Sequence, residues 1–194
     1  MKHYNSKNYT SRKAQYKICI SGGSEGENAE KAFDLARKVG MEIARRGHVL
    51  ITGATNGVPY EAAKAAKKAG GSNIGFSPAG TEIEHRKKFR LPMDPKIFDH
   101  IIYTEAGYAG RNLLMVRSAD ATIMIDGRMG TLNEFTAAFE EGEIVGVLEG
   151  SGGTADLVRQ ILKVAKKGQR KVIFDNDPAR LVERVIERIK KEKK

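Results

Sequence analysis

A glycine-bearing stretch that ends in a carboxylate, residues 126–134 (Asp-Gly-Arg-Met-Gly-Thr-Leu-Asn-Glu), is the part of the chain best suited to chemistry. The apolar run 121–125 before it is typical of a buried strand, and residues 135–139 after it are apolar at helical spacing. A glycine turn between strand and helix directs free N–H groups and the positive helix end at one spot, which suits a phosphate. Glu134 would lie in the first helical turn, within reach of whatever is bound. The alternative is an ordinary turn in which Thr131 caps the helix.

Two further glycine turns follow runs that are expected to be strands. Ser21-Gly-Gly-Ser24 ends the first run, and Gly53-Ala-Thr-Asn-Gly57 ends the second. Glycine can adopt a positive φ and lets the backbone approach a ligand closely. One such turn is weak evidence, but three at strand ends indicate a pocket for a nucleotide or another phosphate-bearing ligand. The residues predicted to bind it are Gly22, Gly23, Ser24, Gly53, Thr55, Asn56, Gly57, Gly127, Arg128, Met129, Gly130 and Thr131.

An arginine is expected near the same edge. Arg111 would lie at the start of a helix, where its five donors could reach a phosphate or a carboxylate. Leu113, Leu114 and Val116 follow in the same helix and are expected to face the sheet.

Strand and helix patterns alternate along most of the chain, which predicts a parallel sheet with helices on both faces. The fold class is therefore α/β, a Rossmann-like three-layer sandwich with about seven mainly parallel strands, whose ligands bind beyond the carboxyl ends of the strands. The expected strands are Lys17–Ser21, Val49–Thr52, Asn73–Ser77, His100–Thr104, Ala121–Ile125, Ile144–Leu148 and Lys171–Phe174. The expected helices are Ala29–Arg46, Pro59–Ala69, Ala109–Ser118, Thr131–Glu141, Ala155–Lys167 and Pro178–Lys191.

One long irregular piece interrupts this alternation. Residues 79–98 are rich in charge and contain Pro92 and Pro95. A loop of this length within a compact domain is usually functional or disordered. Because it follows the end of a strand, it is either a lid over the pocket or an excursion on the surface.

The net charge of +10 is concentrated at the two ends of the chain. Residues 1–17 carry five basic and no acidic side chains, and residues 190–194 carry four lysines and one glutamate, which leaves about +2 for the rest. Residues 1–15 are therefore expected to form a basic flexible tail, with a single domain at 16–194. Solvated tails explain the charge better than a nucleic-acid groove, so nucleic acid is an unlikely partner.

Several other classes of protein are disfavoured. No apolar run approaches the length of a membrane span, and the first residues lack a signal core, which favours a cytoplasmic protein. The single Cys19 lies in an apolar strand and is expected in the core. We predict neither a metal site nor a cofactor, because the histidines lack the spacing of ligands; they are His3, His48, His85 and His100.

These residues carry a family resemblance that spans about residues 16–150. The chain resembles the superfamily of the LONELY GUY (LOG) phosphoribohydrolases, the proteins labelled "possible lysine decarboxylase" and the molybdenum cofactor carrier proteins. The LOG pattern P-G-G-x-G-T-x-x-E is similar to residues 126–134, and the family arginine falls on Arg111, nine residues before Asp120. The sequences Gly-Arg-Asn at 110–112 and Arg-Ser-Ala-Asp at 117–120 are more similar to the carrier-like branch.

The chain departs from the LOG pattern at three positions. It has Asp126 and Arg128 where LOG enzymes have proline and glycine, and Asn112 where they have lysine. A carboxylate at 126 would repel a phosphate unless Arg128 or the helix end offsets it. Arg128 could clamp the phosphate or fill the pocket, and it would be strained if its position needs a positive φ.

The resemblance implies a function in two alternatives. One is hydrolysis of a nucleoside 5′-monophosphate to free base and ribose 5-phosphate, with Glu134 and Arg111 as the catalytic residues. In that scheme Glu134 stabilises the oxocarbenium-like ribose or orients water, and Arg111 steadies the phosphate or the leaving base. The other is a non-catalytic carrier or sensor of a nucleotide-like cofactor. Nothing in the sequence resembles a pyridoxal phosphate site, so a lysine decarboxylase is rejected. The resemblance also implies a homodimer or a higher homo-oligomer.

Overall fold

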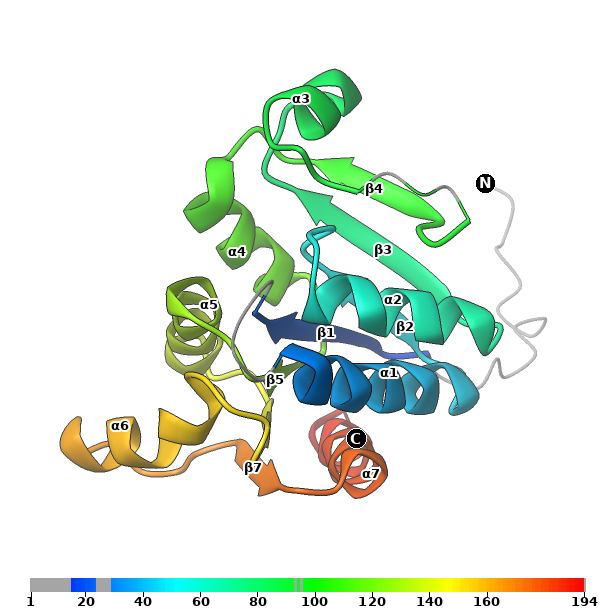
Figure 1. Ribbon diagram of the computed structural model, residues 1–194. Coiled ribbons are helices and arrows are strands. Elements are labelled where there is room, and N and C mark those ends of the chain that lie inside the picture. The colour runs from blue at the N-terminus through cyan, green and yellow to red at the C-terminus, as the bar shows by residue number, and fades with distance from the viewer. Residues whose placement is uncertain (1–14, 24–28, 93, 95, 194) are drawn as a thin grey trace, which may run out of the picture.

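A parallel sheet flanked by helices forms the centre of the computed structural model, which describes residues 15–23, 29–92, 94 and 96–193 (Figure 1). All strand pairs are parallel, in the order β4-β3-β2-β1-β5-β6-β7. The strands are β1 (Lys17–Gly22), β2 (Val49–Thr52), β3 (Ser72–Ser77), β4 (His100–Tyr103), β5 (Ala121–Ile125), β6 (Val145–Leu148) and β7 (Val172–Asp175). The predicted seven-stranded α/β fold is confirmed.

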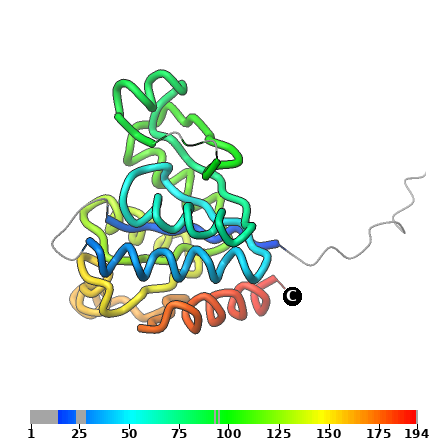
Figure 2. The backbone as a smooth tube through the Cα atoms, turned by 45° about the vertical axis from the view of Figure 1, so that its right-hand side comes forward, coloured from blue at the N-terminus to red at the C-terminus, as the bar shows by residue number. Residues whose placement is uncertain are grey.

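Helices cover both faces of this sheet, as the alternating pattern predicts (Figures 1 and 2). Buried side chains from α1, α2 and α7 pack on one face, and those from α4, α5 and α6 pack on the other. The helices are α1 (Ala29–Arg45), α2 (Val58–Lys68), α3 (Glu82–Lys87), α4 (Gly107–Arg117), α5 (Met129–Glu140), α6 (Val158–Val164) and α7 (Pro178–Glu192), with a short 3₁₀ helix η2 (Ala155–Leu157) before α6.

Cys19 is fully buried in β1, as expected for a core residue. Burial raises the pKa of its thiol well above the ordinary value, which keeps the group neutral. No helix in the described part of the chain is long and apolar enough to cross a membrane. The expected basic tail, residues 1–15, falls outside the described residues except for Gln15.

The segment expected to be irregular, residues 79–98, contains the helix α3. Thr81 caps α3 by accepting a hydrogen bond from the N–H of Glu84. His85 is buried, with Nδ1 2.8 Å from the Ser77 hydroxyl and Nε2 3.0 Å from the Pro92 carbonyl. The segment is therefore held at the end of β3 by a buried histidine that makes two hydrogen bonds.

The sheet order also fixes where a ligand pocket is expected. The chain runs outward from β1 to β4, then crosses back to β5 on the other side of β1. The first and fifth strands thus flank the point at which the winding direction reverses, and their following turns diverge there. In doubly wound sheets, ligands bind at this switch point, beyond the carboxyl ends of the strands.

Candidate functional site

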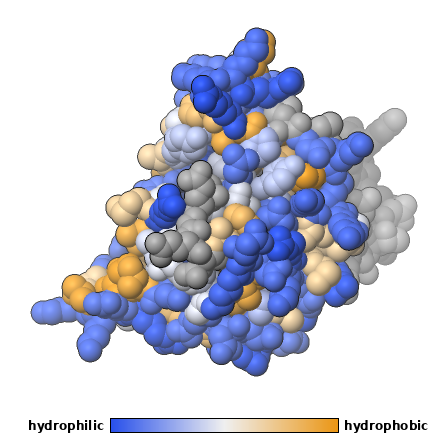
Figure 3. Space-filling view, viewed as in Figure 1, coloured by the Kyte–Doolittle hydropathy of each residue, from blue (hydrophilic) through white to orange (hydrophobic). Residues whose placement is uncertain are grey.

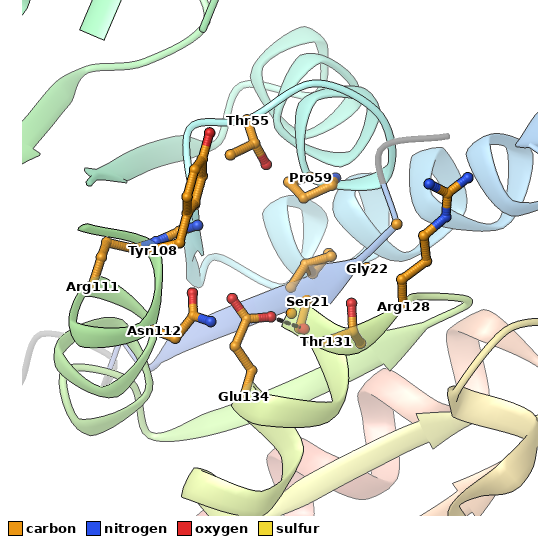
Figure 4. A pocket seen from close by; sticks show the side chains of 14 residues that line it. Ser21, Gly22, Thr55, Pro59, Tyr108, Arg111, Asn112, Arg128, Thr131 and Glu134 are labelled. Atoms are coloured by element: carbon orange, nitrogen blue, oxygen red, sulfur yellow. Dashed lines mark hydrogen bonds between the residues drawn. The ribbon is translucent and has the colours of Figure 1, made fainter. Parts of the chain in front are cut away.

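A pocket of about 360 Å³ lies at the switch point, where all three glycine turns meet α4. Its lining comes from β1, from the turn before α2, and from the first turns of α4 and α5 (Figure 4). The residues that line it are Ile20, Ser21, Gly22, Gly23, Gly53, Thr55, Pro59, Tyr108, Arg111, Asn112, Arg128, Gly130, Thr131 and Glu134.

Most of the residues predicted from the sequence meet in this pocket. The predicted residues that line it are Gly22, Gly23, Gly53, Thr55, Arg111, Arg128, Gly130, Thr131 and Glu134. Gly57 and Gly127 shape neighbouring backbone with positive φ values, 77° and 104°, rather than lining the cavity. Asn56 and Met129 are exposed outside the lining, and Ser24 falls outside the described residues.

Sequence reasoning missed three polar lining residues, Ser21, Tyr108 and Asn112. Ser21 directly precedes the glycines of the first turn, so its place at a strand end was the available signal. Tyr108 carries no pattern of its own, and Asn112 was noted only as a departure from the LOG lysine and not as a binding residue. Both reach the pocket because they share the first two turns of α4 with Arg111.

The helix α5 begins without a side-chain cap. Its N-cap residue is Arg128, whose side chain makes no capping hydrogen bond, and its first turn holds no acidic residue. The alternative in which Thr131 caps this helix is therefore wrong, because Thr131 lies inside the first turn. Free N–H groups and the positive helix end are left facing the pocket, which favours an anion there.

The turn before α5 has a backbone that the proline of the LOG motif could not adopt. Asp126 has a φ of 55° and Gly127 a φ of 104°, whereas Arg128 has an extended φ of −125°. The position of Arg128 does not need a positive φ, so the condition for strain there is not met. Aspartate tolerates the left-handed conformation better than most residues, but proline cannot adopt it. A proline at position 126 would require a different turn.

The loop after β6 supports this turn and takes up the Asp126 side chain. The Thr154 N–H donates to the Gly127 carbonyl at 2.9 Å, and the Ser151 hydroxyl accepts from the Asp126 N–H at 2.8 Å. The Asp126 carboxylate points at Gly23 and Gly152, where an added Cβ would lie 2.5 Å and 2.9 Å from its oxygens. It does not line the pocket. The carboxylate therefore lies behind the glycine turns and not inside the pocket.

Arg128 lies at the mouth of the pocket. Its side chain is exposed and points away from Glu134 (Figure 4). It therefore leaves the floor of the pocket open and places a positive charge at the rim, next to the free N–H groups of α5.

Glu134 forms the floor of the pocket. It lies in the second turn of α5, and not in the first as expected, because the helix begins at Met129. Its side chain is buried, and the Ser21 hydroxyl donates a hydrogen bond to its Oε2 (Figure 4). Burial raises the pKa of the Glu134 carboxyl, while the charge of Arg111 and the Ser21 hydrogen bond oppose that rise. A carboxyl held in this way is suited to general acid–base or electrostatic work.

Arg111 lies beside Glu134 and is only 4% exposed. Its Nη1 is 3.7 Å from the Met115 sulfur, and Tyr108 places its ring 6.0 Å from the guanidinium carbon. An added Cβ on Gly53 would lie 1.7 Å from Nη1. The absence of a side chain at Gly53 thus makes room for the Arg111 guanidinium, and not only for a ligand.

The orientation of α4 differs from the prediction. Arg111, Asn112, Met115 and Val116 are buried, whereas Leu113 and Leu114 are 39% and 45% exposed. The expectation that these two leucines face the sheet is wrong, because the inner face of α4 is turned toward a polar pocket. Val116 packs inward as expected.

The segment 79–98 stands beside the pocket without lining it, as far as its residues are described. Phe89 packs edge-to-face on Tyr108, with ring centroids 5.5 Å apart. Through this contact it supports one wall. Elsewhere, the described residues hold no cluster of three histidine, cysteine, aspartate or glutamate side chains that could bind a metal ion.

Replacing Glu134 with glutamine should stabilise the fold at neutral pH. The pKa of the Glu134 carboxyl is raised in the folded state. The carboxyl therefore stabilises the fold at pH values below its pKa in the unfolded chain, and this stabilisation is lost as the pH rises through its pKa in the folded state. Glutamine resembles the protonated form at every pH. Urea denaturation from pH 5 to 8 should give a variant that gains stability over the wild type as pH rises. A difference independent of pH would contradict the raised pKa.

Together, the fold and the pocket define a Rossmann-like α/β protein with an anion-favouring rim and a buried carboxylate on its floor. The chain belongs to the SLOG cluster4 family, whose model matches residues 15–182. The superfamily resemblance noted in the sequence, to LOG proteins and molybdenum cofactor carriers, is confirmed.

Three known proteins are similar to this chain. An uncharacterized protein of Archaeoglobus fulgidus is 38% identical over 124 residues, which cover 64% of this chain and 75% of that one. The molybdenum cofactor binding protein of Rippkaea orientalis is 28% identical, with a TM-score of 0.73 over 94% of this chain and all of that one. The molybdenum cofactor carrier protein of Chlamydomonas reinhardtii is 24% identical, with a TM-score of 0.72 over 90% and 98% of the chains, and shows the fold alone.

Proposed function

We propose that this protein binds a nucleoside 5′-monophosphate and hydrolyses its N-glycosidic bond, giving free base and ribose 5-phosphate. One observation carries the proposal: a buried carboxylate, Glu134, lies beside a buried cation, Arg111, in a pocket whose rim is an uncapped helix start. The rim favours a phosphate, and the floor places a negative charge where a sugar attached to that phosphate would lie.

The reaction assigns a task to each part of the pocket. The phosphate binds at Gly130, Thr131 and Arg128. The bond from C1′ to the base breaks with its electron pair on the base, while a water oxygen bonds to C1′ and one of its protons goes to the base. Glu134 stabilises the positive charge that develops on the ribose, or orients the water. Arg111 holds a fixed positive charge beside it and steadies the phosphate or the leaving base.

The test is to incubate the protein with AMP, GMP, CMP and UMP and to separate the products by chromatography. Free base should appear from at least one monophosphate, and the matching nucleosides should stay intact because they lack the phosphate. Absence of base from every monophosphate would contradict the hydrolase.

A carrier of a nucleotide-like cofactor is the second candidate. It is favoured by the likeness to the Rippkaea orientalis protein, whose name states that it binds molybdenum cofactor, over the whole of that chain. The same pocket would serve both functions. Mass spectrometry of small molecules that co-purify with the protein separates them, because a carrier should retain an intact cofactor and bind it without cleavage.

We also propose a symmetric homodimer formed beside the pocket. Leu113 and Leu114 expose apolar surface on α4, and Figure 3 shows further hydrophobic side chains along the left-hand edge, over α5 and α6. An isologous contact through α4 would bury Leu113 and Leu114 and leave the apolar surface of α6 exposed. Light scattering should give twice the 21.3 kDa chain mass, and Leu114→Asp should give a monomer. Val164→Asp, an exposed apolar residue on α6, is the matched control and should stay dimeric. A monomeric wild type at micromolar concentration would refute the dimer.

A further inference from the structure

Two buried polar atoms on the pocket floor have no hydrogen-bond partner among the described residues. They are Nε of Arg111 and Oδ1 of Asn112, and each side chain is only 4% exposed. Buried polar groups are nearly always paired, because an unpaired one loses its bonds to water without replacement. Figure 4 shows both side chains directed at the same part of the pocket as Glu134. Both side chains line the pocket, so a small shift of each toward a bound ligand would supply the missing partners.

The two atoms differ in hydrogen-bonding sense. Arg111 can only donate. The Asn112 amide nitrogen donates to Oδ1 of Asn133 at 3.0 Å, so its free Oδ1 is an acceptor. Glu134 adds a second acceptor, since only its Oε2 is bonded to Ser21. The floor thus offers the donors of Arg111 beside two acceptors, Asn112 Oδ1 and the Glu134 carboxylate.

This combination does not suit a phosphate. An ionised phosphate only accepts hydrogen bonds, so it would satisfy Arg111 and leave Asn112 unpaired and Glu134 repelled. A hydroxyl group both donates and accepts, and therefore satisfies Arg111 and Asn112 together. A second hydroxyl on the neighbouring carbon would donate to Glu134. The floor is complementary to a vicinal diol.

We propose that Asn112 is a specificity-determining residue that binds the 2′-hydroxyl of ribose, so that the pocket prefers ribonucleotides to 2′-deoxyribonucleotides. This inference rests on the proposed function, because it takes the ligand to be a nucleoside 5′-monophosphate. The 2′-hydroxyl donates to Asn112 Oδ1 and accepts from Arg111 Nε, and the 3′-hydroxyl donates to Glu134. The Nη groups of Arg111 keep the role that the proposed function gives them. The phosphate then lies at the start of α5.

The experiment measures the affinities of AMP and 2′-deoxy-AMP by isothermal titration calorimetry. The full chain carries Glu134→Gln, so that the nucleotides are not consumed. We expect AMP to bind about tenfold more tightly, because the deoxy analogue leaves buried polar groups unpaired. Adding Asn112→Leu should lower the affinity for AMP and leave the affinity for 2′-deoxy-AMP nearly unchanged. The preference for AMP should then fall below about twofold. Asn112→Asp keeps an acceptor and should keep the preference.

Controls separate this role from a structural one. Asn176→Leu changes an exposed asparagine beside α7 and should leave the preference at its starting value. Asn112→Ala provides a smaller change if the leucine variant does not fold, as judged by circular dichroism. 3′-Deoxy-AMP lacks the hydroxyl that contacts residue 134. The preference for AMP over 3′-deoxy-AMP should therefore persist in the Asn112→Leu and Asn112→Ala variants.

Three outcomes would overturn the inference. Equal affinity for AMP and 2′-deoxy-AMP before any change at Asn112 would do so while leaving the proposed function intact. A ribose preference that survives Asn112→Leu and Asn112→Ala would remove Asn112 from the role. A change in the preference between AMP and IMP with Asn112→Leu would show that Asn112 contacts the base. Failure of both AMP and 2′-deoxy-AMP to bind would instead overturn the proposed function itself.

Discussion

Glu134→Gln is expected to lower base release by at least about a hundredfold while leaving nucleotide affinity within about tenfold of the wild type. Glutamine keeps the shape of the side chain and an oxygen that can accept the Ser21 hydrogen bond. It removes the negative charge, which matters most when positive charge develops on the ribose. An interaction that strengthens only in the transition state changes turnover more than binding. Chromatography of the released base and calorimetry of nucleotide binding measure the two quantities.

The matched control is Glu140→Gln, which changes an exposed glutamate on the same helix, α5. It should leave turnover and affinity unchanged. Base release that survives Glu134→Gln would break the proposed mechanism. Tight nucleotide binding by the wild type with no release of base would favour the carrier.

The second large effect is expected at Gly53, through Arg111. An added Cβ at Gly53 would lie 1.7 Å from Nη1, so Gly53→Ala must displace the guanidinium from its position. Arg111→Ala removes the same group outright. Loss of a charge-assisted contact of roughly 1.5–3 kcal/mol predicts that either change weakens nucleotide binding by roughly 10- to 150-fold and lowers turnover as well. Calorimetry and the base-release assay measure both.

A double variant tests whether Gly53 acts through Arg111. If its role is to make room for the guanidinium, Gly53→Ala should add little to Arg111→Ala, because the displaced group is already gone. Additive losses would show a separate role for Gly53, such as a direct contact with the ligand. Gly168→Ala is the control, since an added Cβ there meets no atom within 4 Å.

The sheet and the three glycine turns could be predicted because they depend on local pattern. Apolar strand runs, amphipathic helices and glycines at strand ends are visible in short windows of sequence. In α7, apolar residues at helical spacing form one buried face, and they are Leu181, Val182, Val185, Ile186 and Ile189.

The orientation of α4 could not be predicted in this way. Its inner face carries Arg111 and Asn112, and its outer face carries Leu113 and Leu114, which is the reverse of an ordinary amphipathic helix. The rule that apolar residues face inward fails where the interior is a polar pocket. Such failures are expected at functional sites, where side chains are placed to bind a ligand and not to pack in the core.

Backbone conformations and close contacts between distant residues also could not be predicted from the sequence. The sequence places Asp126, Gly127 and Arg128 in a turn but does not say which of them takes a positive φ. The close approach of Gly53 to Arg111 joins residues far apart in the chain. Likewise, the helix α3 is too short to stand out within a charged segment, and it is held by the burial of His85.

A crystal structure of the Glu134→Gln variant with AMP tests the central claim most directly. We expect intact nucleotide in the pocket, with its phosphate within hydrogen-bonding distance of the N–H groups of Gly130 and Thr131 and its ribose over residue 134. A nucleotide bound elsewhere, or an Arg128 guanidinium filling the phosphate position, would contradict the account.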